Sequence, residues 1–210
     1  MFPFYITIYI SAEIIKEHKS IRLTNRNCFN CVKVEAAYNN WGAASYADIW
    51  ALSRNSNYPS FDADCTNFAS QAMHEGGTLP FDKRNGWYCK KVLWWWNWGT
   101  AWSVADDLYR YLSNSARGTI LGRWKYEGQI GFNDYNDVLQ PGDILFYDWN
   151  SDGRFDHAGV SVGLGYDSTT YGRTGNVQDQ HTYDRFHAIW HLSPYNQKRT
   201  TTTIVAIRPK

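Results

Sequence analysis

Apolar residues recur at helical spacing in three stretches of the chain. The first stretch predicts a helix over residues 37–53, and the third predicts one over residues 101–114. The second begins at Cys65 and is followed by Gly76–Gly77, a pair that commonly ends a helix. Its apolar positions fall at i, i+3, i+4, i+7 and i+8 along one helix face: Cys65, Phe68, Ala69, Ala72 and Met73.

Short strand-like runs follow the three predicted helices. We expect strands at residues 144–147, from His157 onward, and at 177–182, 187–192 and 203–207. Helices that come before strands favour an α+β fold, with N-terminal helices packed on a C-terminal antiparallel sheet. Residues 80–100 and 165–176 are expected to be loops. Within the first of these, the tryptophans at 94–96 and 98 are expected to pack against the neighbouring helix and Trp102, although a glycan-binding surface is the alternative.

Length and charge narrow the classes of protein that the chain can represent. Its 210 residues are enough for one sizeable domain, and a formal net charge of +1 does not indicate a nucleic-acid surface. We expect residues 1–35 to be a leader of unknown role and residues 36–210 to form the domain. We also expect the protein to be a monomer. The apolar residues 1–15 are too short for a transmembrane helix and lack the positive region of a secretion signal.

The four cysteines cannot all pair in disulfides if one of them is a nucleophile. They are Cys28, Cys31, Cys65 and Cys89. A structural zinc site needs four ligands, and the Cys28-x-x-Cys31 pair has no second pair to complete it. We therefore interpret that spacing as chance or as a local disulfide.

Cys65 is the candidate nucleophile. Its place in the first turn of a helix favours a thiolate, which is the reactive form. Asp62 and Asp64 are N-terminal caps in this prediction, but their charge opposes the thiolate, so a cation must outweigh them. His157, at the start of a strand, supplies that cation and acts as the general base. A buried structural cysteine is the competing interpretation.

Four motifs of the chain resemble one family. They are Tyr38–Ala47, Asp64–Ala72 followed by Gly76–Gly77, Leu139–Ile144, and the histidine block Asp156–Val160 with the later block Gln180–Asp184. Together they are similar to the putative amidase domains, which are related to the CHAP group of papain-like cysteine amidases and peptidases of bacterial cell walls. The resemblance covers residues 38–207. It implies a papain-like fold and hydrolysis of an amide bond in peptidoglycan by a cysteine nucleophile.

The remaining members of the site are less defined by the residues. The resemblance places the residue that orients His157 at the start of the next strand, which makes His181 the choice. Residue patterns alone leave three alternatives open: Asn176, Gln178 and Asp179. The oxyanion hole is expected to use the backbone N–H of Cys65, with a second donor from Tyr58 or a protonated Asp64.

Asp148, Asn150, Asp152 and Asp156 match the first half of a calcium loop. The position that should supply a bidentate glutamate is Gly159, so a turn rich in aspartate and glycine is the favoured interpretation. We expect no cofactor, with calcium as the alternative.

The sequence therefore predicts a secreted or cell-wall-associated bacterial enzyme that cleaves an amide bond in peptidoglycan or a related peptide. Three other functions stay open. The domain could be an inactive module that binds cell-wall glycan, a toxin or transferase that uses the same Cys65–His157 pair on another amide, or a calcium-dependent structural module.

Overall fold

The computed structural model describes residues 37–126, 128, 131–168 and 172–210. The predicted leader, residues 1–35, lies outside these residues, as do Cys28 and Cys31. The predicted domain boundary near residue 36 and the state of those two cysteines therefore stay predictions.

The helices come first, as the apolar spacing predicts. Helix α2 spans Asn40–Trp50, and the side chain of Asn39 accepts the N–H of Gly42 at its start. Helix α3 spans Cys65–Gln71 and continues as a π-helical turn, η1, over Ala72–Gly76. A short 3-10 helix, η2, covers Lys83–Asn85. The predicted helix 101–114 is in fact two helices, α4 (Thr100–Ser103) and α5 (Ala105–Leu112), because Val104 between them has extended backbone angles.

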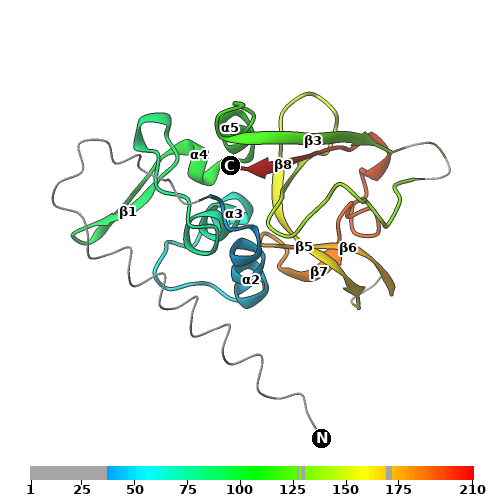
Figure 1. Ribbon diagram of the computed structural model, residues 1–210, viewed down its shortest axis with the longest axis horizontal. Helices are drawn as coiled ribbons and strands as arrows, with labels where there is room; N and C mark the ends of the chain where they lie inside the picture. The colour runs from blue at the N-terminus through cyan, green and yellow to red at the C-terminus, as the bar shows by residue number, and fades with distance from the viewer. Residues whose placement is uncertain (1–36, 127, 129–130, 169–171) are drawn as a thin grey trace, which may run out of the picture. The chain divides into compact units, whose positions relative to one another are not determined.

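Six antiparallel strands form the main sheet in the order β3-β8-β4-β5-β6-β7 (Figure 1). Their bounds are β3 Gly118–Lys125, β4 Ile144–Asp148, β5 His157–Asp167, β6 Arg173–Gln180, β7 Arg185–Ile189 and β8 Thr203–Pro209, with a 3-10 turn, η3, at Arg199–Thr201 before β8. Strand β3 was not predicted. The predicted loop 165–176 is wrong at both ends, because β5 and β6 each extend into it.

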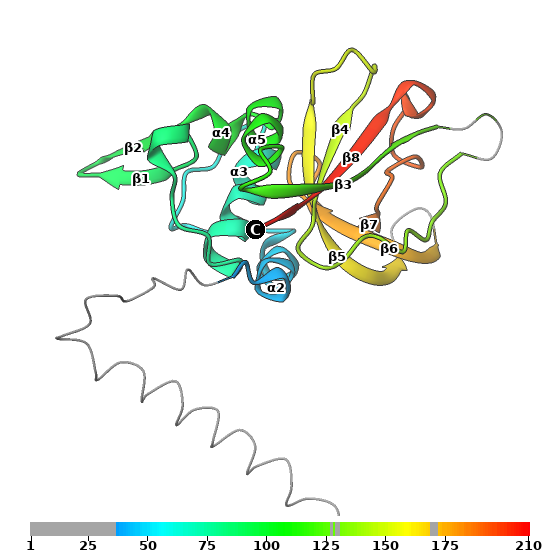
Figure 2. The ribbon, with the colours of Figure 1, turned by 45° about the horizontal axis from the view of Figure 1, so that its top comes forward.

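The predicted loop 80–100 is wrong as well. Strands β1 (Cys89–Val92) and β2 (Trp95–Trp98) pair there as an antiparallel hairpin. Figure 2 shows this hairpin on the helical side of the domain, extending away from the sheet. Trp95 and Trp98 of β2 are exposed, so much of its aromatic surface lies outside the core.

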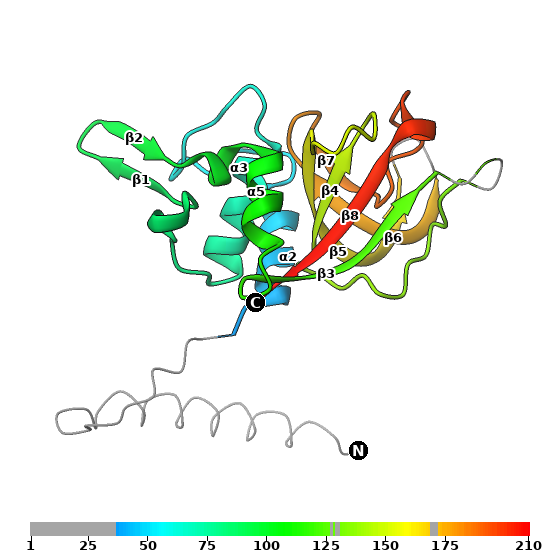
Figure 3. The same ribbon diagram turned by 90° about the horizontal axis from the view of Figure 1, so that it is seen from above.

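Apolar side chains cover both faces of the central strands. On β4, Ile144 and Phe146 belong to the cluster shared with the helices, whereas Leu145 and Tyr147 belong to a second cluster with the end of β7 and the segment after it. Figure 3 shows α2, α3 and α5 gathered on one side of β4 and β8. Each such side chain contributes about 1.5–3 kcal/mol when fully buried, so β4 is held from both sides.

Two glycines let the first two helices approach backbone to backbone. A Cβ on Gly42 would lie 2.2 Å from the carbonyl oxygen of Gly76, and a Cβ on Gly76 would lie 2.2 Å from that of Gly42. No larger residue fits at either position without separating α2 from η1. This contact fixes the helix that begins with Cys65.

The turn before β4 is held by a buried carboxylate. Asp143 accepts two hydrogen bonds from Arg208, at 2.8 and 2.9 Å, and one from the N–H of Gln140 at 2.7 Å. Gly142 has φ +83°, a conformation that suits glycine, and its carbonyl oxygen accepts the hydroxyl of Tyr38. This Pro-Gly-Asp turn therefore anchors β4, the neighbour of the histidine strand.

Candidate active site

Cys65 and His157 are both at the first residue of their elements. Cys65 starts α3 and His157 starts β5, where it pairs with Tyr147 of β4. Their exposed fractions are 6% and 5%. Both line a pocket of about 440 Å³, together with Trp149, Gln180 and Thr182 among others. The fold thus brings together the predicted nucleophile and its predicted base.

Electrostatics at Cys65 favour the thiolate. Burial by itself raises the pKa of the thiol, but the charge of His157 and hydrogen bonding to it outweigh burial and lower that pKa to about 7. A smaller contribution comes from the backbone of Ala158. This agrees with the expectation that a cation, His157, must favour the thiolate of Cys65. Of the described cysteines, Cys65 and Cys89 are both free, and burial raises the pKa of Cys89 to about 12.

His157 shows the reciprocal effect. Burial lowers the pKa of its imidazole, but the thiolate of Cys65 and, more weakly, Gln180 shift the pKa upward overall, against Arg185. The ring of Trp149 stacks on the imidazole with centroids 5.6 Å apart. The Nε2 atom of His157 is buried and has no hydrogen-bond partner among the described residues. Packing against Trp149 and the interaction with Cys65 therefore hold the imidazole, and no described residue satisfies its Nε2 atom.

Gln180 is the polar neighbour of His157 that sequence reasoning missed. Hydrogen bonding to Gln180 favours the charged imidazole. Gln178 in turn donates to the side-chain oxygen of Gln180 at 2.9 Å, and a Cβ on Gly159 would collide with Gln178. Strand alternation places Gln178 and Gln180 on one face. That pattern could have identified Gln180, but Gln178 was the only one of the two considered.

His181 does not contact His157, so the prediction that it orients the base needs correction. Its Nδ1 lies 2.6 Å from Asp64 Oδ2, and its Nε2 lies 2.8 Å from the carbonyl oxygen of Trp50. Both ring nitrogens are engaged. Because successive strand residues face opposite sides, Gln180 faces the pocket while His181 faces α3.

Asp64 anchors α3 in a different way from the predicted cap. Its side chain makes no capping hydrogen bond. Instead Oδ1 accepts from the N–H of Phe61 and from Asn67, while Oδ2 contacts His181 and lies 3.2 Å from Arg54 Nε. These contacts offset the charge of a fully buried carboxylate. Both oxygens act as acceptors, so Asp64 does not fit the predicted role of oxyanion donor.

The predicted oxyanion donors are arranged differently from expectation. The N–H groups of Asp64 and Cys65 both donate to Thr182 Oγ1, at 2.7 and 3.1 Å. The hydroxyl of Tyr58 donates to Glu75, and its ring stacks on Trp96 and Trp102. Tyr58 therefore does not face Cys65. Thr182 was not predicted, and no pattern in the sequence identifies it.

Thr182 has an unusual backbone. It lies with Tyr183 in the left-handed region, at φ +56° and +68°, in the turn between β6 and β7. A β-branched residue rarely adopts this conformation, which costs about 1–3 kcal/mol. The hydroxyl oxygen accepts two N–H groups, so its own hydrogen points away from both of them. Thr182 also lines the pocket. The turn thus presents a polarised hydroxyl beside Cys65.

The other predicted polar residues make their hydrogen bonds with partners other than His157. Asn176 accepts the N–H of Asn136, and Asp179 accepts the N–H of His187. In the predicted calcium loop, three carboxylates accept backbone N–H groups of the same loop: Asp148 from Asp152 and Gly153, Asp152 from Arg154, and Asp156 from Trp149. That geometry is the favoured aspartate- and glycine-rich turn. Calcium binding there stays a prediction.

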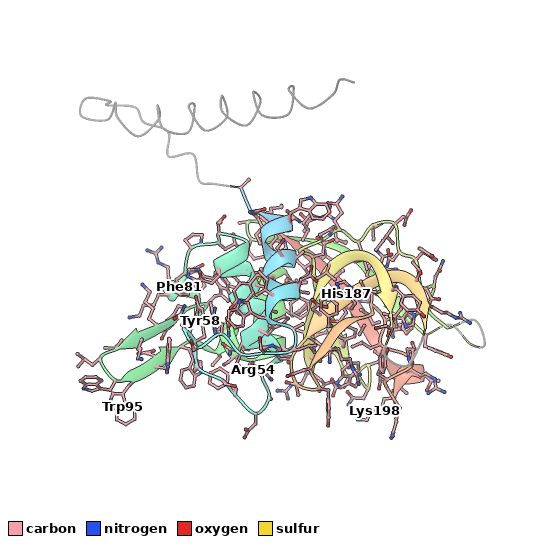
Figure 4. All side chains as sticks on the ribbon, turned by 90° about the horizontal axis from the view of Figure 1, so that it is seen from below. Arg54, Tyr58, Phe81, Trp95, His187 and Lys198 are labelled. Atoms are coloured by element: carbon pink, nitrogen blue, oxygen red, sulfur yellow. The ribbon has the colours of Figure 1, made fainter. Side chains whose placement is uncertain are left out.

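The tryptophan run does not pack as expected. The exposed fractions of Trp94 and Trp95 are 86% and 78%. Trp96, by contrast, lies against Tyr58 in the core. Figure 4 labels Trp95 on the hairpin and Lys198 among the residues that line the Cys65 pocket. The hairpin therefore exposes the rings of Trp94 and Trp95 to solvent.

Comparison with known proteins identifies the family. The family model described as "Putative amidase domain" matches residues 37–204. The chain belongs to this family. Both cysteine and histidine of the pocket lie within the matched residues, so the amidase domain includes the whole candidate site. A search of solved structures found no match. The chain has a mixed fold of helices and a large antiparallel sheet.

Two relatives come from Bacillus subtilis (strain 168). One, "Uncharacterized protein YhbB", is 36% identical over 129 residues, which are 60% of this chain and 37% of that protein. The other, "Uncharacterized protein YjcM", is 29% identical over 131 residues, which are 59% of this chain and 27% of that protein. The amidase domain thus matches about a third of each relative. Within the described residues, no helix has both the length and the apolar character needed to cross a bilayer.

Proposed function

We propose that the amidase domain is a cysteine-dependent amide hydrolase of bacterial peptidoglycan, with Cys65 as nucleophile and His157 as general base. The observation that carries this proposal is the buried Cys65–His157 pair, in which each partner favours the charged form of the other. The order of cysteine before histidine, with the sheet behind them, supports a papain-like fold. We further propose that the protein acts as a monomer outside the cell or at the cell wall.

The reaction follows from the charges of the pair. The thiolate of Cys65 attacks the amide carbonyl carbon, and the carbonyl electrons move to oxygen. The imidazolium of His157 then gives its proton to the leaving amine as the carbon–nitrogen bond breaks, which leaves a thioester on Cys65. Neutral His157 next takes a proton from water, and the resulting attack on the thioester releases the carboxylic acid and restores the thiolate.

Two further residues fit roles in this reaction. The hydroxyl of Thr182, polarised by the N–H groups of Asp64 and Cys65, is placed to donate to the oxyanion. Hydrogen bonding to Gln180 favours the imidazolium, so the role of Gln180 would be to position His157. Neither step requires a metal or a cofactor.

The surroundings of the pocket support a peptidoglycan substrate. Arg185 and Lys198 line the pocket and fit the carboxylates of a stem peptide. The exposed rings of Trp94 and Trp95 fit the apolar faces of sugars. The same rings favour the second candidate function, an inactive module that binds cell-wall glycan.

Digestion of purified peptidoglycan separates the two functions. Wild-type protein, Cys65→Ala and the matched control Cys89→Ala are each incubated with the substrate, and released groups are identified by mass spectrometry. Cys89 is buried outside the pocket, so its loss removes a thiol without touching the site. We expect new amines or muropeptides from wild type and Cys89→Ala alone. Binding without release from any of the three proteins would instead establish the glycan-binding module.

An amine acceptor added to the same reaction tests the transferase alternative. A hydrolase releases a free carboxylate, whereas a transferase joins the acyl group to the added amine. A mass shift equal to the acceptor in most of the product would overturn hydrolysis as the main reaction.

A further inference from the structure

A second cluster of chemically competent side chains lies outside the Cys65 pocket. Asp48 of α2, Asp179 of β6 and His187 of β7 each offer one ligand atom, and these atoms lie within 4.8 Å of one another. None of the three lines the pocket of Cys65 and His157. Figure 4 labels His187 beside α2. The cluster therefore joins the first helix of the domain to the edge of the sheet.

His187 is held toward the helix by an unusual backbone. Its φ is +54°, in the left-handed region, and its N–H donates to Asp179 Oδ1 at 2.6 Å. Its ring nitrogen Nε2 lies 2.9 Å from Asp48 Oδ1. A conformation of this kind persists only where the surroundings enforce it. Here it brings an imidazole nitrogen and two carboxylates to one point.

Asp179 is the member of the cluster with a buried oxygen that lacks a partner among the described residues. Its side chain is fully buried, and its Oδ2 atom has no hydrogen-bond partner among the described residues. The carboxylate of Asp48 lies close by, and in the described part of the chain only the Oδ1 atom of Asp179 has a partner, the N–H of His187. A buried carboxylate is costly unless a cation, a proton or a hydrogen bond satisfies it. The second carboxylate makes that requirement stronger.

We propose that Asp48, Asp179 and His187 bind a divalent metal ion, with Zn²⁺ as the best-fitting ion. Two carboxylate oxygens and one imidazole nitrogen form a common donor set for Zn²⁺, which takes such ligands at about 2.0–2.2 Å. The exposed fractions of the Asp48 and His187 side chains, 44% and 29%, leave an open side through which the ion enters and water completes its coordination.

The bound ion would crosslink α2 to the β6–β7 hairpin. Gln180 is the next residue after Asp179 and Thr182 lies three positions after it, so holding Asp179 also holds the strand end that reaches the Cys65 pocket. The metal itself takes no part in the chemistry at Cys65. The proposal is therefore independent of the amide hydrolase, and either can fail without the other.

The test is a titration of the full chain with Zn²⁺ after its thiols have been alkylated. Alkylation removes Cys65 and the other accessible cysteines as competing zinc ligands and leaves the Asp48 cluster intact, while Cys89 is buried. Isothermal calorimetry gives stoichiometry and affinity, and a thermal melt in Zn²⁺ or in chelator gives the stability shift, since a ligand that binds the folded state raises its melting temperature. Co²⁺ provides a spectroscopic probe of nitrogen and oxygen ligation.

Three variants are compared with wild type. Asp48→Asn changes an exposed side chain at little risk to folding, and Asp179→Asn removes the buried ligand. The matched control is Asp134→Asn, which disrupts another Asp–His pair, with Nε2 of His191 3.0 Å from Asp134.

We expect one equivalent of Zn²⁺ bound by wild type and by Asp134→Asn, with a higher melting temperature than in chelator. Asp48→Asn and Asp179→Asn should each weaken binding at least tenfold and lose the thermal shift. The proposal is overturned if wild type takes up no stoichiometric Zn²⁺, or if both cluster variants bind as tightly as wild type. In the first case a proton shared by the two carboxylates explains the cluster.

Discussion

Replacement of His157 by glutamine should make Cys65 an ordinary, slow thiol. In the wild-type protein burial raises the pKa of Cys65, but contacts led by the imidazolium outweigh burial and lower that pKa from 9.0 to about 7, a net change of about 3 kcal/mol in favour of the thiolate. Glutamine carries no charge, while the burial that opposes the thiolate remains. The pKa of Cys65 in His157→Gln should therefore rise above its ordinary value.

The change in reactivity can be worked from those values. At pH 6, about a tenth of a thiol with pKa about 7 is ionised, against about a thousandth for one with pKa 9.0. The thiolate of lower pKa is also the weaker nucleophile, and this reduces the hundredfold difference in thiolate fraction to a rate difference of roughly tenfold. We therefore expect alkylation of Cys65 at pH 6 to slow about tenfold or more in His157→Gln.

The assay is alkylation by iodoacetamide from pH 5 to 10, followed by peptide mass spectrometry so that each cysteine is measured separately. The wild-type rate at Cys65 should rise as pH rises through about 7 and then level off, because the thiolate forms in that range. Cys89, whose pKa burial raises to about 12, is the internal control and should react slowly in both proteins. Equal Cys65 profiles in wild type and His157→Gln would refute the coupling of the two residues.

Two further predictions concern residues beside this pair, and a third concerns the turn before β4. Thr182→Val should lower kcat of the proposed hydrolase about 10²–10³-fold with little change in KM, while Thr182→Ser retains most activity. Unchanged or higher activity in Thr182→Val would mean that the hydroxyl blocks the Cys65 N–H instead. Gln180→Leu should move the alkylation profile of Cys65 to higher pH, by less than His157→Gln does; an unmoved profile would contradict its contact with the imidazole. Asp143→Ala should destabilise the fold by about 2 kcal/mol in urea unfolding, because Arg208 and the N–H of Gln140 lose their acceptor; an unchanged midpoint would contradict an anchoring role.

The elements with strong local patterns were predictable from the sequence. The apolar stripe from Cys65 to Met73 and the Gly76–Gly77 pair give the helix that begins the site, and the short apolar runs give β4, the start of β5 and β8. Strand β3 was missed because its alternation is weak, with one buried residue at its start. The hairpin β1–β2 was missed because most of its apolar side chains face outward.

The candidate site divides in the same way. Cys65 and His157 follow from residue type and from their places at element starts. The residues that contact Cys65 and His157 depend on which face of β6 turns toward the pocket. A shift of one residue along the chain would place His181 there instead of Gln180. Thr182 acts through a left-handed backbone conformation that its residue type does not predict. Contacts of this kind are set by the assembled sheet rather than by local sequence.

The separation of Cys65 and His157 along the chain has a consequence for biosynthesis. The two residues are 92 positions apart, from 65 to 157, and the thiol owes its acidity to the histidine. A growing chain presents Cys65 before His157, so the thiol of the emerging polypeptide has the ordinary pKa of a free cysteine. The nucleophile is activated only when β5 has joined the sheet. The acidity of the Cys65 thiol is thus a property of the assembled domain and not of the local sequence around the cysteine.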